Sequence, residues 1–259
     1  MMAGGVQQFL LDAYPSGIPC FSLRKLKNTY TGSAIRVRRS TDNAEQNIGF
    51  NINGDLDTVA LTTFCSGTNG FVTTWYDQST SNNLIQTTAI NQPQIVSAGN
   101  LITRNSRAYI ESSSTQFFNL SSFITLSNRS IFLTYEKNTS GNQAILLRNS
   151  TNVAWLDFGL QQYISNTDFI NISSINQINT LYLINMNVSF SSYGNFYRNG
   201  TLLGTKNSPM SLNGVLEFFP ANQFRTTAVF MSEIILYNVD QSSNRTGIET
   251  NIKTYFGIP

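Results

Sequence analysis

The feature that most constrains the fold is a series of short strand-like segments that recur about every ten residues from residue 100 onward. Polar turns separate these segments, and such regular spacing is typical of a two-sheet sandwich. The Asn199-Gly200 pair lies between two of them and predicts a type I′ hairpin turn. The expected strands cover residues 101–103, 108–111, 117–119, 130–136, 144–148, 154–158, 160–164, 180–187, 189–198, 201–206, 216–219 and 228–237.

The first hundred residues mix strands with short helices. Alternation predicts strands over residues 34–39, 47–53 and 71–76, and a shorter one over 93–96. Capping residues and apolar periodicity predict helices over 55–64 and 240–256, a short helix over 6–13 and one helical turn near 20–26. We therefore expect an all-β sandwich of two antiparallel sheets, with short N-terminal helices and one C-terminal helix.

Composition excludes several chemistries. The 259 residues include no histidine, which removes Ser-His-Asp, Cys-His and His-metal sites. The net charge of +2 is too small to indicate nucleic acid or membrane as a partner, and no apolar run is long enough to span a bilayer. Cys20 and Cys65 are either one bridge or two buried thiols. We expect no metal and no cofactor.

The stretch from residue 71 to 94 holds the sharpest local signal. Trp75, Tyr76, Asp77 and Gln78 come at the end of a strand and at the start of a polar turn. An aromatic ring there could stack on a sugar while the acid and the amide bind its hydroxyls, or the aromatic residues could be core and Asp77 could hold the turn.

A second polar loop follows the strand at 34–39. Asp42 and Asn43 lie in this loop, and we predict that they join the four residues at 75–78 in a carbohydrate-binding site. With Glu45 and Asp77 they also carry the oxygen ligands that calcium prefers, which keeps a calcium site as the alternative to ordinary loop capping.

The N-terminal segment is apolar but has no basic region or long hydrophobic core of the kind found in signal peptides. We expect residues 1–19 to form an anchoring arm that docks on a partner chain, and residues 20–259 to form the sandwich domain. The predicted docking side chains are Val6, Phe9, Leu10 and Leu11.

Two groups of motifs carry a family resemblance. FYRNGTLLGT (196–205) and SEIILYNVDQSSNRTGIETNIKTYFGI (232–258) resemble the end of a laminin G-like, concanavalin A-like jelly roll. SLRKLKNTYTGSAIRVRRSTDNAEQNIGF (22–50), FVTTWYDQS (71–79) and NQPQIV (91–96) resemble the N-terminal part of the α-L-arabinofuranosidase B catalytic domain and lectin-like modules of phage and bacterial surface proteins.

The resemblance implies either glycoside hydrolysis, which needs a pair of carboxylates, or carbohydrate binding without hydrolysis. In the enzymes a nucleophile follows an Asp-x-Glu pattern, and the nearest stretch here has Asp157 with glycine at position 159. Fourteen acids are present, and no pattern sets two of them opposite each other; those in or near predicted strands are Glu111, Glu136, Asp157, Glu217 and Glu233.

We therefore expect a non-enzymatic structural protein of a bacteriophage particle (a spike, a fibre or a capsid decoration) with a lectin-like domain and no catalytic residues. Its expected location is the virion, assembled in the host cytoplasm. The expected partners are other virion proteins, further copies of the chain and a cell-surface glycan. The alternatives are a glycoside hydrolase of the arabinofuranosidase type and a bacterial surface adhesin.

Overall fold

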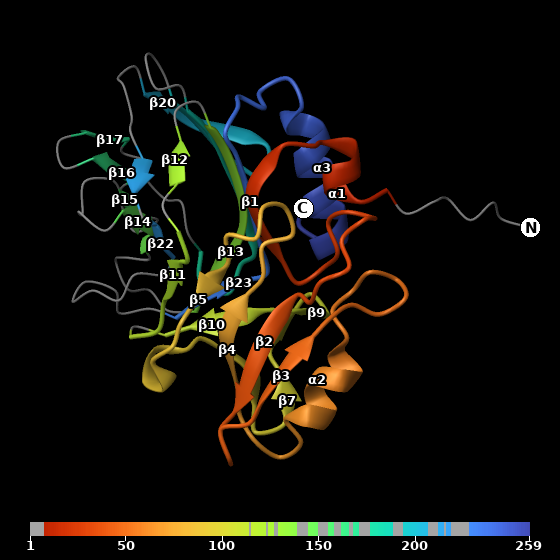
Figure 1. Ribbon diagram of the computed structural model, residues 1–259. Helices are drawn as coiled ribbons and strands as arrows, with labels where there is room; N and C mark the ends of the chain where they lie inside the picture. The colour runs from red at the N-terminus through yellow and green to blue at the C-terminus, as the bar shows by residue number, and fades with distance from the viewer. Residues whose placement is uncertain are drawn as a thin grey trace, which may run out of the picture.

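The structure is a computed structural model that describes residues 8–113, 115–122, 124–126, 129–138, 145–149, 155–157, 162–165, 168–170, 177–188, 194–206, 212–214, 216–218 and 228–259. Strands dominate it, and every pairing between the described strands is antiparallel. The expected all-β jelly-roll sandwich is confirmed (Figure 1).

The first sheet consists of neighbouring strands in the order β1–β24–β13–β18–β19–β20. All nine residues of β13 are buried, because the second sheet covers one face of this strand and a helix layer covers the other. The strands of this sheet are β1 (Gly17–Ser22), β13 (Arg129–Lys137), β18 (Tyr182–Val188), β19 (Gly194–Arg198), β20 (Thr201–Lys206) and β24 (Glu233–Tyr237).

The second sheet begins with β3–β2–β4 and then divides, because β4 pairs with β5 at one end and with β6 at the other. One branch continues as β5–β11–β22–β14–β15, and the other as β6–β10–β23. The last two residues of β13 pair with β23, which joins the two sheets.

The strands of the second sheet are β2 (Ile35–Arg39), β3 (Glu45–Ile48), β4 (Gly70–Trp75), β5 (Leu84–Ile85), β6 (Gln94–Ser97), β7 (Asn100–Leu101), β10 (Ile110–Ser112), β11 (Phe118–Leu120), β14 (Ile145–Asn149), β15 (Trp155–Asp157), β22 (Leu216–Phe218) and β23 (Val229–Met231). Separate two-stranded pairs are β8 (Thr103–Arg104) with β9 (Arg107–Ala108), β12 (Ile124–Leu126) with β21 (Leu212–Gly214), and β16 (Gln162–Ser165) with β17 (Asp168–Ile170).

The described helices are short apart from the last: α1 (Leu10–Ala13), α2 (Thr58–Phe64), the 3₁₀ turn η1 (Ala89–Asn91) and α3 (Arg245–Phe256). Figure 1 shows α3 beside β1 and α1, on the outer side of the first sheet. A main apolar core fills the space between the sheets, and a second core lies under α3 and α1. No helix in the described residues is long and apolar enough to cross a membrane.

The predicted hairpin at Asn199-Gly200 is present between β19 and β20. Asn199 has φ 51° and Gly200 has φ 91°, the left-handed pair that a type I′ turn requires. The C-terminal helix is shorter than predicted and ends at Gly257, whose φ of 62° gives the left-handed cap typical of a helix end. Asp57 caps α2 as expected, accepting a hydrogen bond from the Ala60 amide at 2.9 Å.

Two expected elements are wrong. The segment predicted to form a helical turn near residues 20–26 begins as the strand β1, because its backbone pairs with β24. The strand predicted over 47–53 ends at Ile48, and Ile52 is fully exposed in the following turn. Both apolar runs were too short for periodicity to distinguish helix, strand and loop.

The N-terminal segment is part of the fold from α1 onward. Leu10 and Leu11 are buried in the second core, so the structure has them packing within their own chain instead of facing a partner. Phe9 is half-buried beside the Lys25 ammonium, and Val6 lies outside the described residues. The predicted boundary after residue 19 falls inside β1. A docking role for the arm stays a prediction.

Candidate functional site

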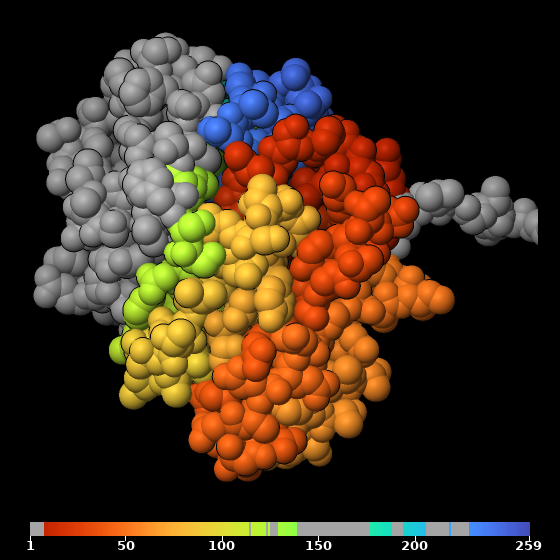
Figure 2. Space-filling view, in the orientation of Figure 1, coloured from red at the N-terminus to blue at the C-terminus, as the bar shows by residue number. Residues whose placement is uncertain are grey.

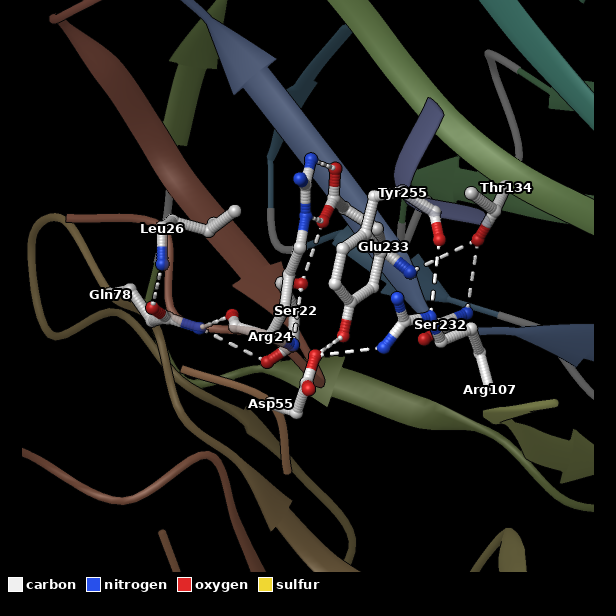
Figure 3. Close-up of polar contacts among 10 residues, drawn as sticks. All are labelled: Ser22, Arg24, Leu26, Asp55, Gln78, Arg107, Thr134, Ser232, Glu233 and Tyr255. Carbon is white, nitrogen blue, oxygen red and sulfur yellow. Dashed lines mark hydrogen bonds and ion pairs between the residues drawn. The ribbon is translucent and has the colours of Figure 1, made fainter. Parts of the chain in front are cut away.

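A buried polar network surrounds Glu233 on β24 (Figure 3). Its carboxylate is fully buried and accepts two hydrogen bonds from the Arg24 guanidinium, at 2.7 Å from Nε and 2.8 Å from Nη2. The Ser22 hydroxyl donates a third at 2.7 Å. A bidentate pair of this kind satisfies both oxygens and fixes their geometry. Glu233 is therefore held as a structural anion between β1 and β24.

The same network continues through Tyr255 of α3. The Arg24 guanidinium lies 4.6 Å from the Tyr255 ring centroid, and the Arg107 guanidinium lies 4.0 Å from it. Arg107 Nη1 then donates to Asp55 Oδ1 at 2.9 Å, and the Tyr255 hydroxyl donates to the same oxygen at 2.6 Å. Two carboxylates, two guanidinium groups and one aromatic ring thus tie α3 to β1, β9 and the loop before α2.

Asp77 and Gln78, two of the predicted sugar-binding residues, are buried and bonded within the protein. Asp77 accepts from the backbone and hydroxyls of Ser79 and Thr80 at 2.5–2.8 Å, and from the amides of Cys20 and Asn82. The Gln78 side chain is bonded to three backbone groups of residues 22–26. Both residues fasten the turn after β4 to the β1 region, which leaves their polar atoms engaged in the fold.

The two aromatic residues of that motif lie differently. Trp75 is completely buried, with its ring 6.0 Å from the Phe21 ring and 6.4 Å from that of Phe118. In this position it belongs to the main core and cannot stack on a ligand, because strand alternation turns it inward. Tyr76 is partly exposed, and its hydroxyl donates to Asn47 Oδ1 at 2.9 Å. A ligand contact by Tyr76 stays a prediction.

Asp42 and Asn43 lie in the exposed turn between β2 and β3. Asp42 makes a two-point ion pair with Arg39, and hydrogen bonding to that guanidinium lowers the pKa of the carboxyl from its ordinary value. Asn43 accepts from Arg38 Nη1 at 2.8 Å. Glu45 is paired with Arg36. Within the described residues, no three acidic or cysteine side chains gather as a metal site. A sugar-binding role for Asp42 and Asn43 stays a prediction.

A different pair of acids shares one face of the joined sheets. Glu111 on β10 and Glu136 on β13 are both register partners of Phe230, on the strand β23 between them. Partners opposite each other in a sheet point to the same face, and two strand spacings set their backbones roughly 9–10 Å apart. Flexible glutamate side chains in such a row can bring two carboxyl groups within the range that glycoside hydrolysis uses.

Arg104 gives these two acids different environments. It forms an ion pair with Glu136, which is buried, and its guanidinium lies 3.7 Å from the centroid of the Phe230 ring. The Glu111 side chain is half-buried, and among the described residues it has no hydrogen-bond or ion-pair partner. Burial raises the pKa of Glu111, and the charge of Arg104 opposes that shift. One acid is thus ion-paired with Arg104, whereas the other has a pKa that burial raises above its ordinary value.

A pocket of about 500 Å³ adjoins this row, and Arg104 and Glu136 both line it. Asn105, Asn179 and Thr180 add polar groups to its wall. The Asn105 amide also donates to the carbonyls of Phe256 and Gly257, both at 3.1 Å. The β8–β9 hairpin is therefore fixed to the end of α3, and it positions Arg104 at the pocket.

Sequence reasoning named Glu111 and Glu136 among strand acids but did not pair them, because alternation within a strand does not reveal its neighbours. Asp157 and Glu217 lie on β15 and β22, on either side of β14, with Glu217 in register with Arg148 and Asn119. The structure describes only their backbone. The sequence signal that could have pointed to Glu111 and Glu136 is the Arg104-Asn-Ser-Arg107 hairpin, whose two arginines precede Glu111 in the chain.

Comparison with known proteins points in one direction. A family model described as Alpha-L-arabinofuranosidase B, catalytic, matches residues 12–120. In Figure 2 much of this segment, coloured from red to yellow-green, gathers in one continuous part of the visible face. No curated protein matches the chain in sequence.

Solved structures extend the likeness along the chain. An arabinofuranosidase complexed with arabinofuranosyl-alpha-1,2-xylobiose matches at 14% identity and a TM-score of 0.73, and the match covers 94% of this chain and 64% of that one. A mutant GH54 arabinofuranosidase soaked with 4-nitrophenyl a-l-arabinofuranoside matches at 13% identity, with the same coverage and TM-score. The binding domain of Paraclostridial Mosquitocidal Protein 1 matches at 15% identity over 70% of this chain and 50% of that one, with a TM-score of 0.52.

These findings overturn the expected function. The prediction of a non-enzymatic virion structural protein is wrong, because the matching family model is that of a catalytic domain and the structures that match over 94% of the chain are arabinofuranosidases. The alternative of a glycoside hydrolase is the one they favour. At 13–15% identity the structural matches establish the fold, and the chain spans 64% of the length of the matched enzymes. The chain therefore resembles the catalytic domain of α-L-arabinofuranosidase B in sequence over residues 12–120, and it shares the fold of solved arabinofuranosidase structures over 94% of its length.

Proposed function

We propose that this chain is a carbohydrate-binding glycoside hydrolase that releases arabinofuranosyl groups from a polysaccharide or oligosaccharide. The observation that carries this proposal is the match of residues 12–120 to the catalytic family model. The jelly-roll fold shared with arabinofuranosidases over 94% of the chain supports it. The complex with arabinofuranosyl-alpha-1,2-xylobiose, which is known for one of those enzymes, supplies the substrate class.

The row of Glu111, Arg104 and Glu136 offers the chemistry that such a reaction needs. Hydrolysis of a glycosidic bond uses one carboxylic acid to protonate the leaving oxygen and one carboxylate that attacks the anomeric carbon or activates a water. We assign Glu111 the role of the acid, since its burial raises its pKa. We assign Glu136 the role of the carboxylate, since it forms an ion pair with Arg104 and lines the pocket.

The surroundings of the row suit a sugar. The adjoining pocket of about 500 Å³ carries amide, hydroxyl and guanidinium groups from Asn179, Thr180 and Arg104, which can bind ring hydroxyls. Arg104 would also stabilise the negative charge of Glu136 while positive charge develops at the anomeric carbon. Phe230 forms the apolar floor between the two acids.

The test is an activity assay of the purified full chain with 4-nitrophenyl α-L-arabinofuranoside, in which the release of nitrophenolate is measured. Hydrolysis by the wild type is expected, and E111Q and E136Q should each reduce kcat by about 10²–10⁴-fold, the usual effect of losing one acid or base. E45Q is the matched control, because Glu45 is an exposed glutamate at the start of β3 that is paired with Arg36, outside the row.

The outcomes distinguish a wrong proposed function from a wrong assignment of the catalytic residues. Absence of hydrolysis by the folded wild type, on this substrate and on arabinose-substituted xylan, would overturn the proposed function. Normal hydrolysis by both E111Q and E136Q would keep the function and reject these residues as its catalytic pair. Circular dichroism of each variant confirms that lost activity is not lost folding.

A further inference from the structure

A second pocket, of about 210 Å³, is lined in part by the β8–β9 hairpin. Ser106 and Arg107 of this hairpin line it, together with Asp55, Tyr255 and Ser232. The larger pocket takes Arg104 and Asn105 from the same hairpin. One short β-hairpin therefore contributes an arginine to each of the two pockets.

The smaller pocket contains polar groups whose bonding capacity is not used up. Asp55 accepts from Arg107 and Tyr255 through Oδ1 alone, and within the described part of the chain its Oδ2 accepts no hydrogen bond. The Ser232 hydroxyl likewise makes no hydrogen bond to the described residues, although the residue is only 1% exposed. An unused polar group at so buried a position is expected to have a water or ligand partner.

The charges of the pocket select a neutral ligand. Asp55 and Arg107 form an ion pair at 2.9 Å, and both line the pocket. A bound anion would face the Asp55 carboxylate, and a bound cation would face the Arg107 guanidinium, so either would meet a like charge. A neutral polyol can donate to the carboxylate and accept from the guanidinium at the same time.

A ligand in this pocket would bind through hydrogen bonds and not by stacking on the aromatic ring of Tyr255. Two guanidinium groups already lie over the Tyr255 ring, at 4.6 Å for Arg24 and 4.0 Å for Arg107. Recognition must then come from the Asp55, Arg107 and Ser232 polar atoms, with apolar contact from Leu23 and Leu101. The volume is below the roughly 300–1,000 Å³ of pockets for drug-sized ligands, which fits a single sugar ring.

We propose that this pocket is a second sugar-binding subsite, which holds one neutral monosaccharide unit beside the Glu111–Glu136 row. As a subsite for the same polymer it rests on the proposed function, whereas its binding of a free sugar does not. The hairpin that lines both pockets would then determine which neighbouring sugar accompanies the one that is released.

The test is an NMR titration of the isotope-labelled full chain with L-arabinose and with D-xylose, and with inorganic phosphate as the charged probe. Both sugars should shift signals of residues that line the pocket, and phosphate should not. S232A removes one hydroxyl and should weaken sugar binding by about fivefold, while D55N should weaken it by about tenfold. S122A, an exposed serine outside the pocket, is the matched control and should bind like the wild type.

The outcomes distinguish this proposal from the catalytic one. E111Q should lose hydrolysis and keep sugar binding at the pocket. Sugar binding that S232A and D55N leave unchanged, or phosphate binding as strong as sugar binding, would overturn the subsite while leaving hydrolysis untouched. Binding by a wild type that hydrolyses nothing would support the pocket and remove the proposed function. S232A is a small deletion and serves as the deciding variant if D55N does not fold.

Discussion

Carboxylates removed from solvent in this protein differ in how many hydrogen bonds they accept. Glu233 accepts three hydrogen bonds and Asp77 accepts six, so the charge of each is fully compensated inside the protein. The Glu111 side chain is half-buried without any such bond among the described residues. Burying a carboxyl without hydrogen-bond partners costs free energy, whereas hydrogen bonds within the fold occupy the oxygens that a ligand would need. The comparison therefore separates two acids that hold the fold from one whose oxygens are available to a ligand.

The ion pairs Arg24–Glu233 and Arg104–Glu136 differ in their solvent exposure. Arg24 and Glu233 have side chains 9% and 0% exposed, and they connect the segment after β1 to β24 inside the network of Figure 3. Arg104 is 28% exposed in its side chain and lines a pocket with Glu136. The first pair is sealed, whereas a ligand can reach the second.

The largest expected effect comes from breaking the sealed pair. R24M should lower the free energy of unfolding by about 3–5 kcal/mol, because it leaves the Glu233 carboxylate buried and uncompensated. The double variant R24M/E233L removes both charges and should recover most of that loss. Urea unfolding of the two variants measures the difference. A single variant as stable as the wild type would show that water reaches Glu233.

The next effect is expected at Asp77. D77N replaces one acceptor oxygen by an amide that faces hydrogen-bond donors, so we expect a loss of about 2–4 kcal/mol in the free energy of unfolding. S79A is the matched control, since it removes a single hydroxyl bond and should cost about 1 kcal/mol. Equal losses in the two variants would contradict the view that Asp77 organises the whole turn.

Much of the fold was predictable because its signals are local. The Asn199-Gly200 turn, the Asp57 cap of α2 and the apolar stripe of α3 are each specified within a few neighbouring residues. The β1 strand was not predictable, because it forms through pairing with β24, more than two hundred residues away in the chain. Tertiary pairing overrides the weak local preference of such a short segment.

The candidate site was less accessible to sequence reasoning. Trp75 and its neighbours stood out by residue type, yet strand alternation buries Trp75 and the turn uses the polar atoms of Asp77. Glu111 and Glu136 stood out only as isolated strand acids. They share a face because β23, about a hundred residues later in the chain, lies between their strands. No local pattern contains that information.

The uncompensated acid predicts a specific pH dependence of stability. Burial raises the pKa of Glu111 above its value of about 4.5 in the unfolded chain. A carboxyl with a raised pKa binds its proton more tightly in the folded state, so it favours folding at low pH and this contribution is lost as pH rises through the folded pKa. E111Q should therefore be more stable than the wild type at pH 7, and the advantage should shrink toward pH 4. Thermal unfolding of both proteins at several pH values measures this difference in stability. Curves of stability against pH that run parallel for E111Q and the wild type would contradict the prediction.

The smallest effect is expected where a carboxylate is paired but exposed. Asp42 is paired with Arg39 in the turn after β2, and hydrogen bonding to that guanidinium lowers its pKa. Solvent screens such pairs, and measured contributions of surface ion pairs are close to zero. D42N should thus leave the melting temperature within the error of the wild-type value, with R24M measured in parallel as the buried counterpart. If D42N were as damaging as R24M, burial would not be what separates the two kinds of pair, and the distinction between sealed and reactive acids would need another physical basis, such as the rigidity of the turns that hold them.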